Sequence, residues 1–250
     1  MADLEFSFKE VLDEIHAFDR IANRFIAGES AGVLRAFYES LRRIRDARST
    51  DRQRWEIPRR QPVRTIPSVG EYEPGGHGEH TVYAELSCLW EITPVVPRKQ
   101  SHPLQIFRLT GIASTEVHLF ESRDGEPREL GTWKMEIGDN ASPGCHFHVQ
   151  MRRDVADPPF PRSLSIPRFP IFFVSPLLAL EFVVAELFQE EWPRQLRETS
   201  ELGRWRSIHL QRLDQFFVWQ LTEVRRGYRL GTPLLQLKAL KPESALFRSE

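Results

Sequence analysis

Two histidines at alternate positions, His146 and His148, are the residues of this chain that suggest chemistry most directly. They belong to the run Cys-His-Phe-His-Val-Gln-Met at residues 145–151, in which polar and apolar residues alternate. In a β-strand this alternation places both histidines and Gln150 on one face, with alternate residues about 7 Å apart. Two imidazoles so placed could ligate one metal ion together with further ligands, or act as acid and base toward a phosphate ester.

Two other residues could complete such a site. His118, expected on a neighbouring strand, is the candidate third metal ligand, and Asp139, just upstream of the pair, could supply a carboxylate. The chain would then be a metal- or histidine-dependent hydrolase of the phosphodiesterase or nuclease type, with His146, His148 and Asp139 as catalytic residues and a divalent metal as cofactor. The alternative is that both rings simply form hydrogen bonds with loops. No nucleotide-binding glycine loop, nucleophile elbow or Cys-x-x-Cys pair is present in the sequence.

A run of arginines between residues 42 and 64 suggests a binding surface instead. Nine arginines stand there against three acidic residues, Asp46, Asp51 and Glu56. Guanidinium groups bind phosphates in a bidentate way, and a tryptophan among them could stack on a nucleic-acid base. The same run could be an arm that docks on a partner protein, since arginine is far more common than lysine throughout this chain. The candidate binding residues are Arg42, Arg43, Arg45, Arg48, Arg52, Arg54, Trp55, Arg59, Arg60 and Arg64.

Two glutamates, Glu181 and Glu186, lie within the most apolar segment of the chain. A buried carboxylate must be paired or have its pKa raised, because an isolated buried charge costs several kcal/mol. The simplest expectation is a structural pair with an arginine such as Arg162 or Arg168, or exposure of one glutamate on the thin polar side of the helix.

The elements that would position these residues can be predicted from periodicity. Apolar residues at three- and four-residue steps predict an N-terminal helical hairpin within residues 1–48, with Glu14 on the charged outer face of its first helix. Residues 49–80 carry four prolines and predict an irregular connector arm rich in Arg, Pro and Gly. Alternating runs over residues 81–151, with an Asp-Gly turn at 124–125, predict an antiparallel sheet of about five strands.

The rest of the chain returns to helix. Residues 152–174 predict a proline-rich crossing, residues 175–227 two helices that begin at a Ser175-Pro176 cap, and residues 228–250 a surface tail. Helices, strands and helices follow one another in blocks, which is typical of an α+β protein rather than of a parallel α/β fold. Residues 81–250 would form its α+β core.

Composition limits the functional classes. The chain of 250 residues has a net charge of −1 and a sequence pI near 6.7, so any binding of nucleic acid must come from a local patch. Cys88 and Cys145, the only cysteines, stand in apolar runs and predict two buried reduced thiols and a cytoplasmic location. Neither a secretory signal nor a membrane span is expected, because the apolar window at 171–188 contains a proline and two glutamates.

The leading interpretation is therefore a non-catalytic recognition or assembly protein of the cytoplasm. It would bind a nucleic acid or a partner protein through the arginine-rich arm, without contacting a membrane. The hydrolase that uses the His146/His148 face is the alternative.

Overall fold

The computed structural model describes residues 4–47, 49–69, 81–95, 106–123, 126–138, 145–151, 169–172, 175–227, 232 and 240–247. The expected α+β class is confirmed, with three C-terminal helices instead of two. The helices are α1 (Phe8–Ala22), α2 (Gly28–Asp46), α3 (Pro176–Leu187), α4 (Glu191–Glu198) and α5 (Leu202–Gly227). The strands are β1 (Glu5–Ser7), β2 (Gln53–Ile57), β3 (Val63–Arg64), β4 (Ser68–Val69), β5 (Thr81–Val95), β6 (Ile106–Arg123), β7 (Glu126–Ile137), β8 (Phe147–Met151) and β9 (Phe169–Pro170).

These strands form one antiparallel sheet with the order β2-β5-β6-β7-β8-β9. The long central strands follow one another as a meander, and Arg123 of β6 lies opposite Glu126 of β7, which confirms the predicted hairpin. At the other end of β6, β1 pairs with Ile106, Phe107 and Arg108. The N-terminus therefore adds to the middle of the sheet and holds α1 against it.

The prediction of an irregular connector arm is wrong over residues 49–69. Instead of being irregular, this segment supplies β2, β3 and β4, which pair in succession along β5 from Ile92 to Thr81. Pro58, Pro62 and Pro67 fall between the three short strands, because a proline cannot donate a hydrogen bond to the sheet. Residues 70–80 of the expected arm lie outside the described residues.

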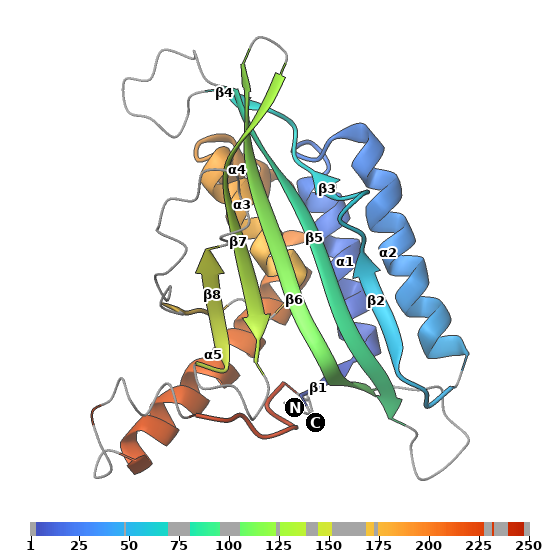
Figure 1. Cartoon of the computed structure of the whole chain (residues 1–250), viewed down its shortest axis with the longest axis vertical. Helices are drawn as coiled ribbons and strands as arrows, with labels where there is room; N and C mark the ends of the chain where they lie inside the picture. The colour runs from blue at the N-terminus through green and yellow to red at the C-terminus, as the bar shows by residue number, and fades with distance from the viewer. Residues whose placement is uncertain are drawn as a thin grey trace, which may run out of the picture.

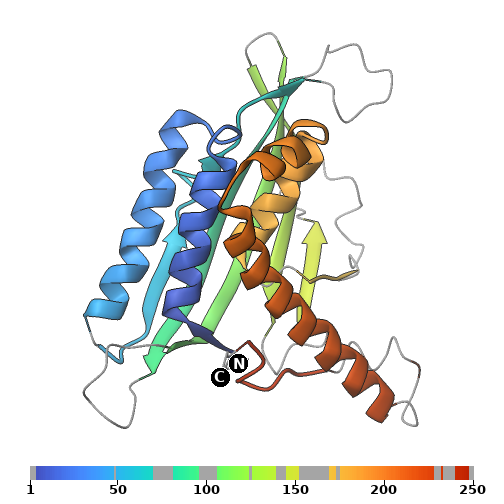
Figure 2. The same cartoon turned by 180° about the vertical axis from the view of Figure 1, so that it is seen from behind.

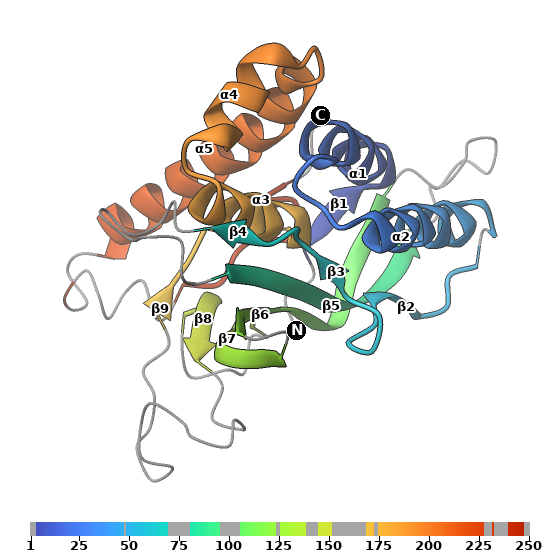
Figure 3. The same ribbon diagram turned by 90° about the horizontal axis from the view of Figure 1, so that it is seen from above.

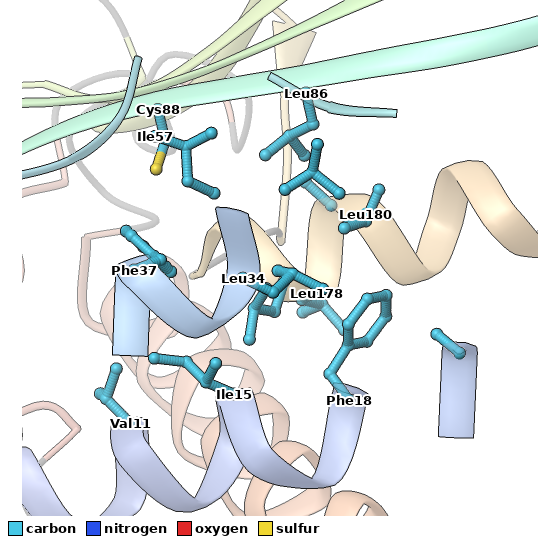
Figure 4. Close-up of a cluster of buried hydrophobic side chains, with 14 of the residues drawn as sticks. Val11, Ile15, Phe18, Leu34, Phe37, Ile57, Leu86, Cys88, Leu178 and Leu180 are labelled. Carbon is cyan, nitrogen blue, oxygen red and sulfur yellow. The ribbon is translucent and has the colours of Figure 1, made fainter. Parts of the chain in front are cut away.

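The helices cover one face of the sheet, and no described helix lies on the other (Figure 1; Figure 3). Figure 4 shows the core that results, where side chains of α1, α2 and α3 meet the inward side chains of the sheet. Leu86 and Cys88 of β5 belong to it, in agreement with the alternation in the sequence. Both cysteines are buried and neither belongs to a disulfide, as predicted, and burial raises the pKa of Cys88 to about 12.

Helix α5 is the longest helix described. Its 26 residues span about 39 Å, and it packs against α1. Further along, Phe216 packs edge-on against Phe147 of β8. The C-terminal end of α5 extends beyond the sheet and the other helices (Figure 1; Figure 2). Within the described residues, no helix is long and apolar enough to cross a membrane.

Candidate functional site

His146 and His148 lie close together near one edge of the sheet, next to the edge strand β9, and both are deeply buried, with 2% of each residue exposed. The strand begins only at Phe147, so His146 stands in the bend before it, with its ring edge-on to Phe147 at 5.1 Å. His148 has Nδ1 2.9 Å from the carbonyl oxygen of Cys145 and Nε2 3.3 Å from a carboxylate oxygen of Glu136. Both ring nitrogens of His148 therefore face protein oxygens instead of solvent.

Glu136, on β7, is the carboxylate that accompanies His148. The interaction with His148 and then the ammonium group of Lys134 outweigh burial and lower the pKa of Glu136 to about 2. The group is thus ionised and engaged at neutral pH. Asp139, the carboxylate expected from the sequence, lies outside the described residues.

His118 is not brought to the His146/His148 pair. On β7 the residue opposite His118 is Thr132, whereas the residue opposite His148 is Glu136. Four residues of strand separate these positions, which is about 13 Å along β7. Among the residues that the structure describes, no three His, Cys, Asp or Glu side chains are grouped so that they could hold a metal ion.

His118 has acidic neighbours of its own on the outer face of the sheet. Its Nδ1 lies 2.9 Å from Glu129 and its Nε2 lies 3.7 Å from Glu116. Glu116 and then Glu129 raise the pKa of His118 against the effect of burial. Because Arg59 also reaches Glu116, at 3.5 Å, this group is a small network of compensating charges.

Most of the arginines in the predicted binding run are neutralised by carboxylates. Eight of the nine lie within the described residues; Arg48 does not. Five ion pairs account for most of their charge: Arg42 with Glu39, Arg45 with Asp46, Arg52 with Glu91, Arg59 with Glu116, and Arg64 with Glu85. Three of these partners stand on β5 and β6, far along the chain, so a count within residues 42–64 overstates the positive charge.

Trp55 is not available for stacking on a base. Its side chain is 1% exposed, lies parallel to the ring of Phe37 at 4.1 Å, and donates a hydrogen bond from Nε1 to the carbonyl oxygen of Phe37 at 3.1 Å. The alternation of β2 turns Trp55 inward and its neighbours outward. This corrects the expectation that Trp55 contributes to the binding surface.

An open groove of about 310 Å³ remains between the C-terminal end of α2 and β2. We call it the α2–β2 groove; its lining includes Ser40, Arg43, Ile44, Ala47, Ser49, Gln53 and Arg54. Arg43 and Arg54 come from different elements, and neither forms an ion pair with a carboxylate of the described residues. Arg60, which also lacks such a pair there, lies outside the groove, in the turn between β2 and β3.

A polar cluster that periodicity did not predict is buried where α1, α3 and α5 meet. Glu14 of α1 is fully buried, and its carboxylate accepts hydrogen bonds from Ser175 Oγ and from Arg212 Nη1, the latter at 2.5 Å. His209 Nε2 lies 3.5 Å away. The outward orientation predicted for Glu14 is therefore wrong. Glu14 falls three residues after Val11 and four before Phe18, inside the apolar stripe, and this spacing was the available signal.

The charges of this cluster follow from burial and pairing. Burial alone raises the pKa of Glu14, but the charges of Arg212 and His209 and two hydrogen bonds outweigh it, so that the pKa is lowered. Burial lowers the pKa of His209 to about 4, although Glu14 acts in the opposite direction. Burial also raises the pKa of Glu181 to about 7, against a hydrogen bond from Trp205. No arginine of the described residues forms an ion pair with Glu181; Arg162 and Arg168, the partners expected from the sequence, lie outside them.

The cluster has the wrong arrangement for nucleophilic catalysis. The carboxylate of Glu14 stands between the serine and the histidine, whereas a catalytic serine needs the base at its own hydroxyl. Ser175 Oγ also accepts a hydrogen bond from the backbone N–H of Leu178 as the cap of α3. The adjoining cavity of about 10 Å³ is barely large enough for one water molecule. We conclude that the cluster has a structural role, linking α1, α3 and α5 through hydrogen bonds and an ion pair.

Comparison with known proteins does not assign the chain to a family. No family model matches the chain, and no match is found among curated proteins or solved structures. The surface groups described above are therefore the basis for a functional conclusion.

Proposed function

We propose that this chain is a non-catalytic recognition protein that binds an acidic segment of a partner protein in the α2–β2 groove. The observation that supports this most strongly is the pair Arg43 and Arg54, which line one groove while most neighbouring arginines are neutralised. Neither guanidinium group forms an ion pair with a described carboxylate, although Arg54 stands opposite Glu91, which already pairs with Arg52. The two groups can therefore bind one or two carboxylates of a ligand in a bidentate way. Ile44 and Ala47 add an apolar wall against which the stem of an acidic side chain could pack.

A protein ligand fits this surface better than a nucleic acid does. Binding of a phosphate chain depends on a continuous positive field, and here the ion pairs remove most of that field. The one aromatic ring within the arginine run is buried against Phe37. A short acidic segment needs only the two guanidinium groups of the groove.

The hydrolase alternative has less support, because its histidines are buried and both ring nitrogens of His148 lie close to protein oxygens. The acid, base or ligand of a hydrolase must be able to reach the substrate or its metal. The experiment below still includes a test for cleavage.

Binding can be measured by fluorescence anisotropy with two labelled probes, a hexaglutamate peptide and a single-stranded oligonucleotide, over a series of salt concentrations. We expect the peptide to bind, and we expect R43A combined with R54A to weaken binding at least tenfold. R60A is the matched control, because it removes an arginine of the same run from outside the groove, and it should change binding less than twofold.

Three results would contradict the proposal. Peptide binding that is equal for the double variant and the native chain would exclude the groove. Tighter binding of the oligonucleotide, with a steep dependence on salt, would favour nucleic acid instead. Cleavage of the oligonucleotide with added Mg²⁺ or Mn²⁺, lost in H146A or H148A, would establish the hydrolase.

A further inference from the structure

A stripe of apolar side chains is exposed along α5. Leu210, Phe217, Val218 and Leu221, which we call the α5 stripe, are 59%, 50%, 56% and 51% exposed in the described structure. The opposite face of the same helix, with Phe216 among others, is buried against the protein. Large apolar residues gathered on one face of a helix are typical of a surface that another protein covers.

Two charged residues lie on the same face of the helix, one within this stripe and one beyond its C-terminal end. Asp214 stands between Leu210 and Phe217 at helical spacing, and Arg225 follows Leu221 by four residues. Both are exposed, and neither forms an ion pair with another described residue. Arg226, by contrast, pairs with Glu223 at 2.7 Å. From Asp214 onward, the face therefore presents an acidic residue, then the apolar Phe217, Val218 and Leu221, and then the basic Arg225.

We propose that the α5 stripe is the contact between two copies of this chain, with the two α5 helices antiparallel. If a twofold axis passes between residues 219 and 220, Asp214 of each copy lies opposite Arg225 of the other. Val218 of each copy then lies opposite Leu221 of the other, next to the axis. The order of charges along the helix therefore complements itself in the antiparallel arrangement, whereas a parallel pair would place like charges together.

The position of α5 favours this contact. Its C-terminal end extends beyond the sheet and the other helices (Figure 2), and nearer the body the ring of Phe217 lies 6.2 Å from that of Phe172. The α2–β2 groove involves different elements, and the two proposals do not depend on each other. Because a single helix pair buries less surface than a standard protein interface, we expect an association in the micromolar range.

Sedimentation equilibrium of the full chain, from about 1 to 200 µM, tests the pairing. We expect a monomer–dimer equilibrium for the native chain, and D214R or R225D alone should each raise the dissociation constant at least tenfold. An equimolar mixture of the D214R and R225D chains should associate again, because each of its two interfacial contacts then joins an arginine to an aspartate. F217D should abolish association in every combination.

The matched control is R226D, which reverses a charge one residue away that already has a partner within the helix. It should leave the dissociation constant within about twofold of the native value. A native chain that stays monomeric up to 200 µM would overturn the proposal. So would a dimer that D214R and F217D do not weaken, or a mixture of D214R and R225D chains that stays monomeric. Circular dichroism verifies that each variant is folded, which we expect because all four positions are exposed.

Discussion

Two groups beside the buried cluster should together change stability little between pH 4.5 and 6.5, because they respond to pH in opposite directions. The pKa of Glu181 is about 7 in the folded chain and 4.5 by its ordinary value, so in this range the folded state holds a proton that the unfolded state has lost. The pKa of His209 is about 4 in the folded chain and 6.5 by its ordinary value, so there the unfolded state holds the extra proton. The two differences cancel in the native chain.

The magnitude of each contribution follows from proton linkage. One proton of difference changes the free energy of unfolding by about 1.4 kcal/mol per pH unit. Through Glu181, stability falls as the pH rises from 4.5 to 6.5, by about 2 kcal/mol in total, because the difference is less than one proton at both ends of this range. Through His209, stability rises by about the same amount over the same range.

Removing either group should therefore reveal how the other group changes stability with pH. In E181Q only His209 remains of the two, and we expect the free energy of unfolding to increase by about 2 kcal/mol from pH 4.5 to 6.5, relative to the native chain. In H209Q only Glu181 remains, and the free energy should decrease by about as much. The matched controls are E186Q on the same helix as Glu181 and H16Q on α1; both residues are exposed, and both variants should follow the native profile.

The assay is urea unfolding followed by far-ultraviolet circular dichroism at pH 4.5, 5.5 and 6.5. The comparison uses the slope of the free energy of unfolding against pH, so a loss of stability that is the same at every pH does not affect the result. If E181Q and H209Q both follow the native profile, neither group is linked to folding and the burial that we assign to them is wrong. Slopes of the same sign in both variants would also refute the reasoning.

Three further changes test the packing by urea unfolding. R212M leaves the carboxylate of Glu14 buried without its main partner and should lower the free energy of unfolding by about 3–5 kcal/mol. Adding E14L should recover most of this loss, whereas a loss under about 1 kcal/mol in R212M would show that the pair is not buried. W55A removes a stacked ring from the core and should cost about 3–5 kcal/mol, whereas a surface tryptophan would cost almost nothing. S175A removes the cap of α3 and a hydrogen bond to Glu14, and we expect a loss of about 1–2 kcal/mol that would be absent if the serine were solvated.

The parts of the fold that depend on local periodicity could be predicted from the sequence. The alternation along β5 and the Asp-Gly turn after Arg123 are properties of neighbouring residues, and the structure has the strand and the hairpin where they indicate. The strands β2, β3 and β4 were not predicted in this way. Strands β3 and β4 have two residues each and are too short to show a period, whereas β2 alternates over five residues but stands in a segment interrupted by prolines. All three pair with the edge of β5.

The candidate sites were less predictable, because the partner of a charged residue often lies far along the chain. Arg64 is matched by Glu85, and Arg52 by Glu91. Arg212, which stabilises Glu14, is separated from it by almost 200 residues. The sequence shows which residues carry charge, but only the fold shows which of those charges are compensated.

The proline-divided edge of the sheet has a consequence for the behaviour of this protein in concentrated solution. An exposed, continuous strand edge is a template on which further chains can add and form fibrils. Here one edge is divided into three pieces by Pro58, Pro62 and Pro67, and the opposite edge is the two-residue β9, which ends in Pro170. Since the net charge of −1 provides little electrostatic repulsion between molecules, these interrupted edges are an important protection against edge-to-edge aggregation.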